Sequence, residues 1–469
     1  MNTAELLARA AGLADSDRHG EAAAICDAVL LNEPDHPGAL FVLGCALLKE
    51  VRHSAAIQIG KRIAGLMPRD PRGWGLLALV YGELNRYEES LKYADKALAC
   101  KRTDKTLAEM AYAHTNAGNW TLADKFAHEA IAEATANPTS LAAVAVQDAN
   151  VSLAYIKLAL GEWEEGFRRF RVTQRTKWRK ERNYGATPEQ VSREWLGEPD
   201  AVVIVTGEQG LGDEIMGASV IPDAARHCRR FIFDCDHRLA ALFQRSFPDV
   251  LVVPGRREEG LRLPIMPTHH KTLFGLSELY RRCDADFPRR PFLTANAEYV
   301  SMFKELFGGQ RTIGLAWSGG LPRTGLEPRT AGLGSFLPLL RRGGAEFVSL
   351  QYGDDEREVV EFEKAHGIRV RRLPWVTRGQ NVEQDGDLLG SLIAACDEVV
   401  GVHTAALHLA SALGVPTTIL THRGSGWRYA RPELLWYPPT TQLWRKRIGE
   451  SWKDCLGRLV EARKERQAA

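Results

Sequence analysis

The sequence predicts an α-helical solenoid followed by two Rossmann-like α/β domains that face a cleft. The stretch 1–170 is rich in Ala and Leu and repeats itself with a period of about 34 residues. Two later regions alternate buried-type strands with helices, and a glycine-bearing turn follows one strand in each. We expect a helical arm at 1–170, a linker at 171–198, and α/β halves at 199–305 and 306–469.

The arm is expected to consist of five helix pairs. Pro34 and Pro68 lie one such period apart, and each closes a segment with two amphipathic helices. The third pair is the clearest, with large residues on one helix and small residues where the next packs closely: Trp74, Leu77, Tyr81, Tyr87, Leu91, Ala94 and Ala97. These stretches resemble tetratricopeptide repeats, although the first two are degenerate and also fit generic helical hairpins. Such an arm offers a concave groove for a protein or peptide, mediates self-association, or only braces the rest of the chain.

Short apolar runs mark the strands of both halves, and amphipathic stretches mark the helices between them. In the first half we expect strands at 201–206, 231–234 and 250–253, with helices ending near 227 and at 238–246. In the second half we expect strands at 312–317, 347–350, 369–373, 398–402 and 417–420, with helices at 333–340, 355–365, 388–395 and 404–413. Ligands bind such sheets at the carboxyl ends of the strands.

Composition excludes several function classes. The 61 Lys and Arg residues nearly balance the 59 Asp and Glu residues, so neither nucleic acid nor an acidic membrane is indicated as the main partner. The eight cysteines show no Cys-x-x-Cys pair and no zinc-like spacing with histidine, which indicates a reduced cytoplasmic setting. We see neither a signal peptide nor an 18-residue apolar run, and therefore expect no membrane span.

The first glycine-bearing turn carries a candidate general base. Gly207, Gly210 and Gly212 let the loop pass close to a ligand, and Asp213 follows at the entry to a helix. Its carboxylate can accept a proton from an acceptor hydroxyl, or it can simply cap the helix. The glycine spacing fits neither a dinucleotide fingerprint nor a P-loop, which disfavours dehydrogenase and ATPase functions.

The second turn lies between the strand at 398–402 and the helix that Thr404 opens. The first N–H groups of such a helix, together with its dipole, form a seat for a phosphate. Since strand–turn–helix units occur in every α/β protein, the turn by itself also fits a site that binds nothing.

Five sequence blocks resemble, in order, those of tetratricopeptide-repeat proteins fused to a glycosyltransferase domain. That domain is similar to the ADP-heptose:lipopolysaccharide heptosyltransferases and, more distantly, to the polypeptide O-linked N-acetylglucosamine transferases, both of the GT-B fold. The blocks are Gly207-Glu-Gln-Gly-Leu-Gly-Asp213, Gly314-Leu-Ala-Trp-Ser-Gly319, Val348-Ser-Leu-Gln351, the segment from His403 to Pro416, and Trp436-Tyr-Pro438.

The resemblance implies transfer of a sugar from a nucleotide-sugar to a macromolecular acceptor, without a metal and with inversion. The acceptor is a glycan such as lipopolysaccharide, or a protein such as flagellin held by the arm. A catalytically inactive scaffold is a further alternative, because His403 stands where heptosyltransferases usually carry Asp. The N-acetylglucosamine transferases carry a His-Thr pair in this turn, so the donor sugar is left open.

The resemblance also assigns roles to residues. It makes Asp213 the general base and Arg329, with Arg323 as a second candidate, the cation beside the leaving diphosphate. The expected nucleotide-sugar contacts are Gly210, Gly212, Trp317, Ser318, Gln351, His403, Thr404, Ala405 and His408. Gln351 fits equally a cap for the following turn, and His408 a packing histidine.

Two further groups are expected near the acceptor side or the domain interface. His269 and His270 are expected in a loop of the first half that faces the acceptor, although paired loop histidines are mostly solvent-exposed. An aromatic tail segment either stacks on the sugar or base or seals the interface between the halves: Trp427, Arg428, Trp436 and Tyr437.

Overall fold

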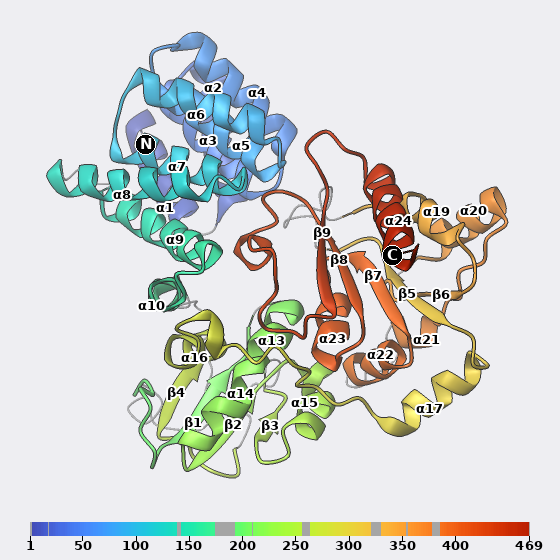
Figure 1. Ribbon diagram of the computed structural model, residues 1–469. Coiled ribbons are helices and arrows are strands. Elements are labelled where there is room, and N and C mark those ends of the chain that lie inside the picture. Colours follow the sequence, from blue (N-terminus) through green and yellow to red (C-terminus); the bar gives the residue numbers. More distant parts are fainter. Residues whose placement is uncertain are drawn as a thin grey trace. The chain divides into compact units, whose positions relative to one another are not determined.

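The structure is a computed structural model and is shown in Figure 1. It describes residues 2–16, 18–137, 142–173, 193–208, 210–255, 263–319, 330–352, 355–377 and 385–468. The chain forms two compact units, the first made chiefly of residues 1–160 and the second chiefly of residues 161–469.

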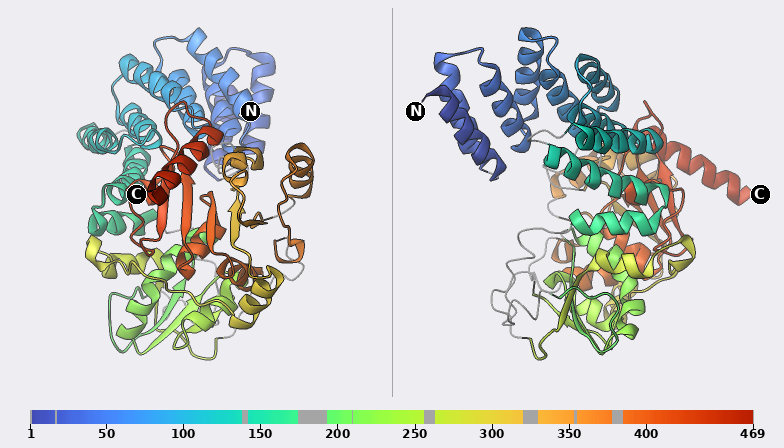
Figure 2. Two further views of the ribbon diagram at one scale, coloured as in Figure 1. Left: turned by 45° about the vertical axis from the view of Figure 1, so that its right-hand side comes forward. Right: turned by 90° about the vertical axis from the view of Figure 1, so that its left-hand side faces the viewer.

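The first unit is a stack of antiparallel helix pairs, as predicted (Figure 2). The first helices of successive pairs begin at Thr3, Pro37, Pro71 and Asp104, which matches the tetratricopeptide period of about 34 residues. The first two repeats, which are degenerate in sequence, form the same kind of helix pair as the third repeat. The helices are α1 (Thr3–Asp15), α2 (His19–Asn32), α3 (Pro37–Lys49), α4 (His53–Leu66), α5 (Pro71–Glu83), α6 (Tyr87–Cys100), α7 (Asp104–Asn116), α8 (Trp120–Ala136) and α9 (Ala142–Leu160).

Local signals explain where these helices begin and how closely they pack. Pro37 and Pro71 occupy the first turns of α3 and α5, where a missing N–H costs nothing, and the side chain of Thr103 caps α7. Ala56 and Ala94 on the second helices are fully buried, because only small side chains let neighbouring helices approach. Helix α10 (Trp163–Thr173), which we expected to close the arm, lies in the second unit.

The first α/β half is built on a four-stranded parallel sheet in the order β3-β2-β1-β4. The three expected strands are present, whereas β4 was not predicted because its sequence, His-His-Lys-Thr, is polar. The expected helix ending near residue 227 is broken by 3-10 turns. The elements are β1 (Val202–Thr206), α13 (Leu211–Gly217), α14 (Ile221–Ala224), β2 (Arg230–Asp234), α15 (Ala240–Ser246), β3 (Leu251–Val253), β4 (His269–Thr272), α16 (Leu273–Tyr280) and α17 (Ala297–Leu306).

The end of the expected linker belongs to this sheet. Residues 174–192 lie outside the described residues, but Glu194 forms a parallel bridge with His270, and the side chain of Trp195 is fully buried. The ammonium group of Lys271, itself buried, donates to Glu194 over 2.8 Å. This short segment therefore covers the outer edge of β4.

The second half is built on a five-stranded parallel sheet in the order β6-β5-β7-β8-β9. The strand expected at 369–373 is absent, because only Arg371 pairs there, in a single bridge with Val348. The last strand and the C-terminal helix were not predicted. The elements are β5 (Thr312–Ala316), α19 (Leu337–Leu340), β6 (Glu346–Ser349), α20 (Glu356–His366), α21 (Pro374–Thr377), α22 (Asp385–Ala394), β7 (Glu398–Val402), α23 (Ala405–Leu413), β8 (Thr417–Thr421), β9 (Thr441–Arg445) and α24 (Trp452–Ala468).

Strand order places one topological switch point in each sheet. The chain runs from β1 outward to β3 and then returns to β4 on the other side of β1. In the second sheet it runs from β5 to β6 and returns to β7 on the other side of β5. Ligands of doubly wound sheets bind where the strand order reverses, at the carboxyl ends of the strands. The turns after β1, β5 and β7 therefore lie where a ligand is expected.

None of the helices among the described residues combines the length and the apolar character that a membrane crossing requires.

Candidate functional site

The switch point of the second sheet ends in the turn that leads into α23. Thr404 is the N-cap residue, with extended backbone (φ −125°, ψ 172°), and its carbonyl oxygen accepts the N–H groups of Leu407 and His408 over 3.1 and 3.3 Å. Its side chain makes no capping hydrogen bond. The hydroxyl is buried and has no hydrogen-bond partner within the described part of the chain. The turn thus combines an unused hydroxyl with the first N–H groups of a helix, beginning at Ala405.

The loop after β5 lies against this turn. A Cβ added at Gly319 would collide with Cγ2 of Thr404, so glycine is required for the two loops to meet. Gln351 fixes the loop: its Oε1 accepts the N–H groups of Trp317 (3.1 Å) and Ser318 (2.9 Å), and its Nε2 donates to the Ser318 carbonyl (2.8 Å). Gln351 therefore caps the end of β5 rather than its own turn.

Trp317 and Ser318 have different surroundings. The indole of Trp317 is fully buried in the core of the second half and donates to Glu358 over 2.6 Å. Ser318 is half-buried, and its hydroxyl lies 3.1 Å from that of Thr330. Trp317 therefore belongs to the core, whereas Ser318 keeps part of its surface exposed.

His408 is a fully enclosed packing histidine. Its Nδ1 lies 2.7 Å from the hydroxyl of Tyr437, and its Nε2 lies 2.7 Å from the hydroxyl of Tyr429. Burial lowers the pKa of His408 to about 4, and burial raises the pKa of Tyr437 well above its usual value. The ring is therefore neutral, and it donates to one tyrosine and accepts from the other. His408 supports α23 from behind.

His403 lies beside Tyr429, one of the two tyrosines that contact His408. The imidazole is buried, with Nδ1 3.5 Å from the carbonyl oxygen of Leu420, and its ring centroid lies 4.9 Å from that of Tyr429. Tyr429 thus contacts both histidines of the turn. It carries no sequence signal of its own, and sequence reasoning did not single it out.

The turn after β1 is held by two buried carboxylates. Glu208 accepts the N–H group of Phe274 over 3.1 Å, which ties the turn to the start of α16, and Glu214 accepts the N–H group of Asp236 over 2.7 Å. Gly210 is the N-cap of α13, so Asp213 lies in the first turn of the helix and does not cap it. The capping interpretation of Asp213 was therefore wrong.

Helix α13 packs against α23, and this packing brings the two switch points together. A Cβ at Gly212 would lie 2.8 Å from Cδ2 of His408, so glycine is needed for the close approach. Asp213 Oδ1 then lies 2.6 Å from Nε of Arg428, and the two side chains are 33% and 22% exposed. The candidate base of one half is thus ion-paired with a cation from the C-terminal part of the other.

The predicted acceptor-side histidines do not lie in a loop. His269 and His270 open β4 and pair with Val203 and Ile204 of β1. His269 is buried, and its Nδ1 lies 2.8 Å from the hydroxyl of Thr268. The loop prediction was wrong because a strand at a covered sheet edge tolerates polar residues that break the usual apolar pattern.

The aromatic tail segment seals an interface. Trp436 packs edge-on against Phe287 (5.0 Å between ring centroids) and Trp163 (5.5 Å), which joins the second half, the first half and α10. The Trp163 indole donates to Asp284 over 2.6 Å. Arg323 and Arg329, the predicted cations, lie outside the described residues. Among the residues that the structure describes, Arg428 is an arginine whose guanidinium contacts the carboxylate of Asp213.

No cluster of three or more histidine, cysteine, aspartate or glutamate side chains suited to a metal ion occurs in the described ranges. Metal independence stays a prediction.

No protein-family model matches the chain. It is similar to Protein FlbA of Caulobacter vibrioides, with 27% identity over 460 residues, 92% of this chain and 73% of the relative. Among solved structures, it is similar to an O-GlcNAc transferase mutant of Thermobaculum terrenum (13% identity, 98% of this chain and 91% of that chain, TM-score 0.39). It is also similar to ADP-heptose lps heptosyltransferase II of E. coli (15% identity, 56% and 99%, TM-score 0.37).

The fold class is the one that the sequence predicts. A helical arm with the tetratricopeptide period precedes two α/β halves, each built on a parallel sheet.

Proposed function

We propose that the protein is a glycosyltransferase that moves a sugar from a nucleotide-sugar to a macromolecular acceptor, and that the reaction takes place in the cytoplasm. The observation that carries the proposal is the buried Thr404 hydroxyl without a partner among the described residues, at the N-terminus of α23 and at a switch point. A donor diphosphate seated there accepts hydrogen bonds from this hydroxyl and from the N–H groups of Ala405 and Ala406. The cytoplasmic assignment is supported by eight cysteines that form no disulfide.

Asp213 and Arg428 then have complementary roles. Asp213 takes the proton of the acceptor hydroxyl while the acceptor oxygen attacks the anomeric carbon, and the nucleoside diphosphate leaves from the opposite face. Arg428 and the helix N–H groups stabilise the negative charge of the departing diphosphate. In the structure the guanidinium of Arg428 is ion-paired with the Asp213 carboxylate. Donor binding must therefore draw the guanidinium toward the phosphates before Asp213 can accept a proton.

The experiment is a thermal-shift screen of nucleotide-sugars against the full chain and a Thr404→Val variant. Valine keeps the shape of threonine and removes only the hydroxyl. We expect one donor class to raise the unfolding temperature, and Thr404→Val to weaken its binding roughly 5- to 30-fold, the effect of one lost hydrogen bond of about 1–2 kcal/mol. Thr404→Ser, which keeps the hydroxyl, is the matched control. No shift with any nucleotide-sugar would favour the inactive scaffold.

The arm carries the features of a peptide-binding groove, which favours a protein acceptor. Arg72 and Lys105 lie over the ring of Phe41, with their cationic groups 5.9 and 4.5 Å from its centroid. The three residues come from α3, α5 and α7, the first helices of successive repeats, whose faces line the concave side of such arrays.

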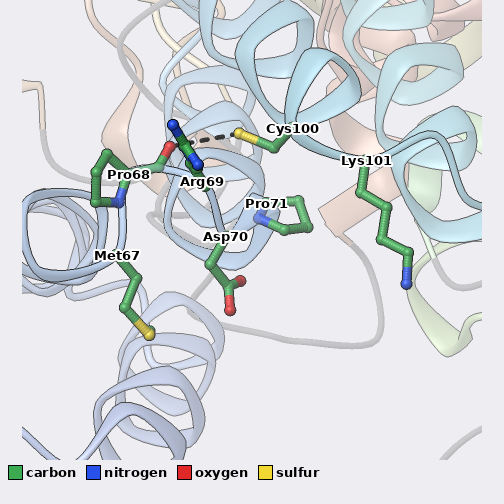
Figure 3. A pocket seen from close by; sticks show the side chains of 7 residues that line it. All are labelled: Met67, Pro68, Arg69, Asp70, Pro71, Cys100 and Lys101. Atoms are coloured by element: carbon green, nitrogen blue, oxygen red, sulfur yellow. Dashed lines mark hydrogen bonds between the residues drawn. The ribbon is translucent and has the colours of Figure 1, made fainter.

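A pocket of about 560 Å³ is lined by the segment between α4 and α5 and by the end of α6 (Figure 3). Asp70, which lines it, is bound by the guanidinium of Arg72 over 2.8 Å, so this ion pair links the pocket to the cluster. The lining combines apolar groups with two cations: Met67, Pro68, Arg69, Asp70, Pro71, Cys100 and Lys101. An acceptor segment with an apolar residue beside acidic residues suits this surface, and flagellin is the first candidate to test.

A further inference from the structure

A second pocket, of about 300 Å³, lies at the opposite end of the second sheet from the candidate site. Glu398 opens β7, Thr417 opens β8, and Arg311 directly precedes β5, so the pocket lies at the amino ends of these strands. A five-residue strand is about 16 Å long, which separates the pocket from the turn at Thr404. Its lining is Arg311, Arg342, Glu398, Pro416, Thr417, Thr418, Thr440, Gln442, Arg463 and Arg466.

The charge of this lining is strongly one-sided. Four arginines come from three separate parts of the chain, and Glu398 is the single carboxylate among the lining residues. Glu398 is held on both sides: Arg463 bonds to one oxygen, and Arg311 lies 3.3 Å from the other. Counted over the lining side chains alone, four guanidinium groups and one carboxylate give a formal charge of +3.

The C-terminal end of α24 explains only part of this concentration of arginines. Arg466 lies in the last turn of α24, where a cation complements the negative end of the helix dipole. However, Arg311 and Arg342 lie on other elements, and Arg463 is oriented into the pocket by a hydrogen bond of 2.9 Å to the hydroxyl of Thr418. Guanidinium groups from separate elements that line one small volume form a site suited to a compact polyanion.

We propose that this pocket binds a phosphate-bearing small anion, independently of the donor site. Guanidinium groups match phosphate oxygens with paired hydrogen bonds, and they lose less hydration than ammonium groups when they do so. The volume admits a di- or triphosphate group and excludes a folded partner. Because Arg463 joins α24 to β7 and β8, a bound anion also strengthens the attachment of the C-terminal helix.

Calorimetric titration of the full chain with inorganic pyrophosphate at low salt tests the proposal. The test variant is Arg342→Ser with Arg466→Ser, since both residues are exposed. The matched control is Arg341→Ser with Arg447→Ser, which removes the same charge from exposed positions outside the lining. The donor site is unchanged in both variants, so a difference between them reports on this pocket.

We expect pyrophosphate binding at this site to weaken at least 10-fold in the test variant and to be unchanged in the control. Gln442→Glu, which adds a carboxylate to the lining without removing a cation, should weaken binding as well. Hydrogen exchange in α24 should slow when pyrophosphate is added to the wild-type chain. Equal pyrophosphate binding by the test and control variants would overturn the proposal, as would a Gln442→Glu variant that binds like wild type.

Discussion

Oδ1 of Asp213 and Nε of Arg428 lie 2.6 Å apart, although the two residues come from different α/β halves of the chain. The pair joins the first turn of α13 to the segment that precedes β9, and both side chains keep part of their surface exposed. A carboxylate held in this way is positioned for chemistry but is not yet available for it.

Replacing Asp213 with asparagine should separate binding from transfer. We expect Asp213→Asn to lower the rate of sugar transfer about 10²- to 10⁴-fold, because a general base contributes about that much, while the thermal shift with the donor persists. Asp200→Asn, at an exposed position of the same half, is the control. Undiminished transfer by Asp213→Asn would refute the assignment of the base.

A methyl group at Gly212 should disturb both halves. The added Cβ would lie 2.8 Å from His408, whose ring is fixed by two tyrosine hydroxyls and cannot withdraw. We expect Gly212→Ala to cost about 1–3 kcal/mol of stability and to reduce transfer by displacing Asp213. Gly334→Ala, with nothing within 4 Å of its Cβ, is the control in calorimetric unfolding. Equal unfolding temperatures for the two variants would contradict the tight packing.

His408 should make the second unit sensitive to acid. Its folded pKa of about 4 lies below the usual 6.5, so its contribution to stability is present above pH 6.5 and is lost as the pH falls toward 4. The loss amounts to about 3 kcal/mol. A His408→Gln variant lacks this titration, so the stability gap to wild type should be largest at pH 7 and shrink at pH 5. A gap that is constant with pH in calorimetry would contradict this account.

Glu109 should have the opposite effect in the arm. Burial raises its pKa to about 7, with Lys105 partly opposing the shift, and its carboxylate packs over Gly75. Since the folded pKa lies above the usual 4.5, the stabilisation present below pH 4.5 is lost as the pH rises through 7. Glu109→Gln should therefore stabilise α5 and α7 by about 2–3 kcal/mol at pH 8 and little at pH 5.

Hydrogen exchange of peptides from α5 and α7 measures this difference. Wild type and Glu109→Gln are compared at each pH, so the intrinsic pH dependence of exchange cancels. Slower exchange in wild type than in the variant at pH 8 would show that the Glu109 carboxylate is stabilised rather than strained.

The cations of the arm should control acceptor binding. We expect Lys101→Ser with Lys105→Ser to weaken retention of flagellin, or of another protein acceptor, about 10-fold, with the thermal shift from the donor unchanged. Lys61→Ser with Lys92→Ser removes equal charge from the second helices α4 and α6 and is the control. Retention that falls equally in both variants would mean that the groove does not select the acceptor.

The sequence by itself determined the architecture and the turns that matter. The regular repeat period and the proline starts specify the helix pairs of the arm, and continuous apolar runs such as Val203 to Val205 specify buried parallel strands. These features are local, since they follow from the repeat of side-chain size and polarity along a few residues. They also placed Asp213 and Thr404 at the starts of the helices that follow β1 and β7.

The tertiary structure decided which side chains meet. Strands β4 and β9 escaped prediction because they lie at sheet edges, where polar residues are tolerated and the apolar pattern is weak. The sequence left open whether His408 contacts a ligand or packs in the core, and the hydroxyls of Tyr429 and Tyr437 at its two ring nitrogens make it a packing residue. The pairing of Asp213 with Arg428 depends on how α13 packs on α23, and no spacing along the chain encodes such a long-range contact.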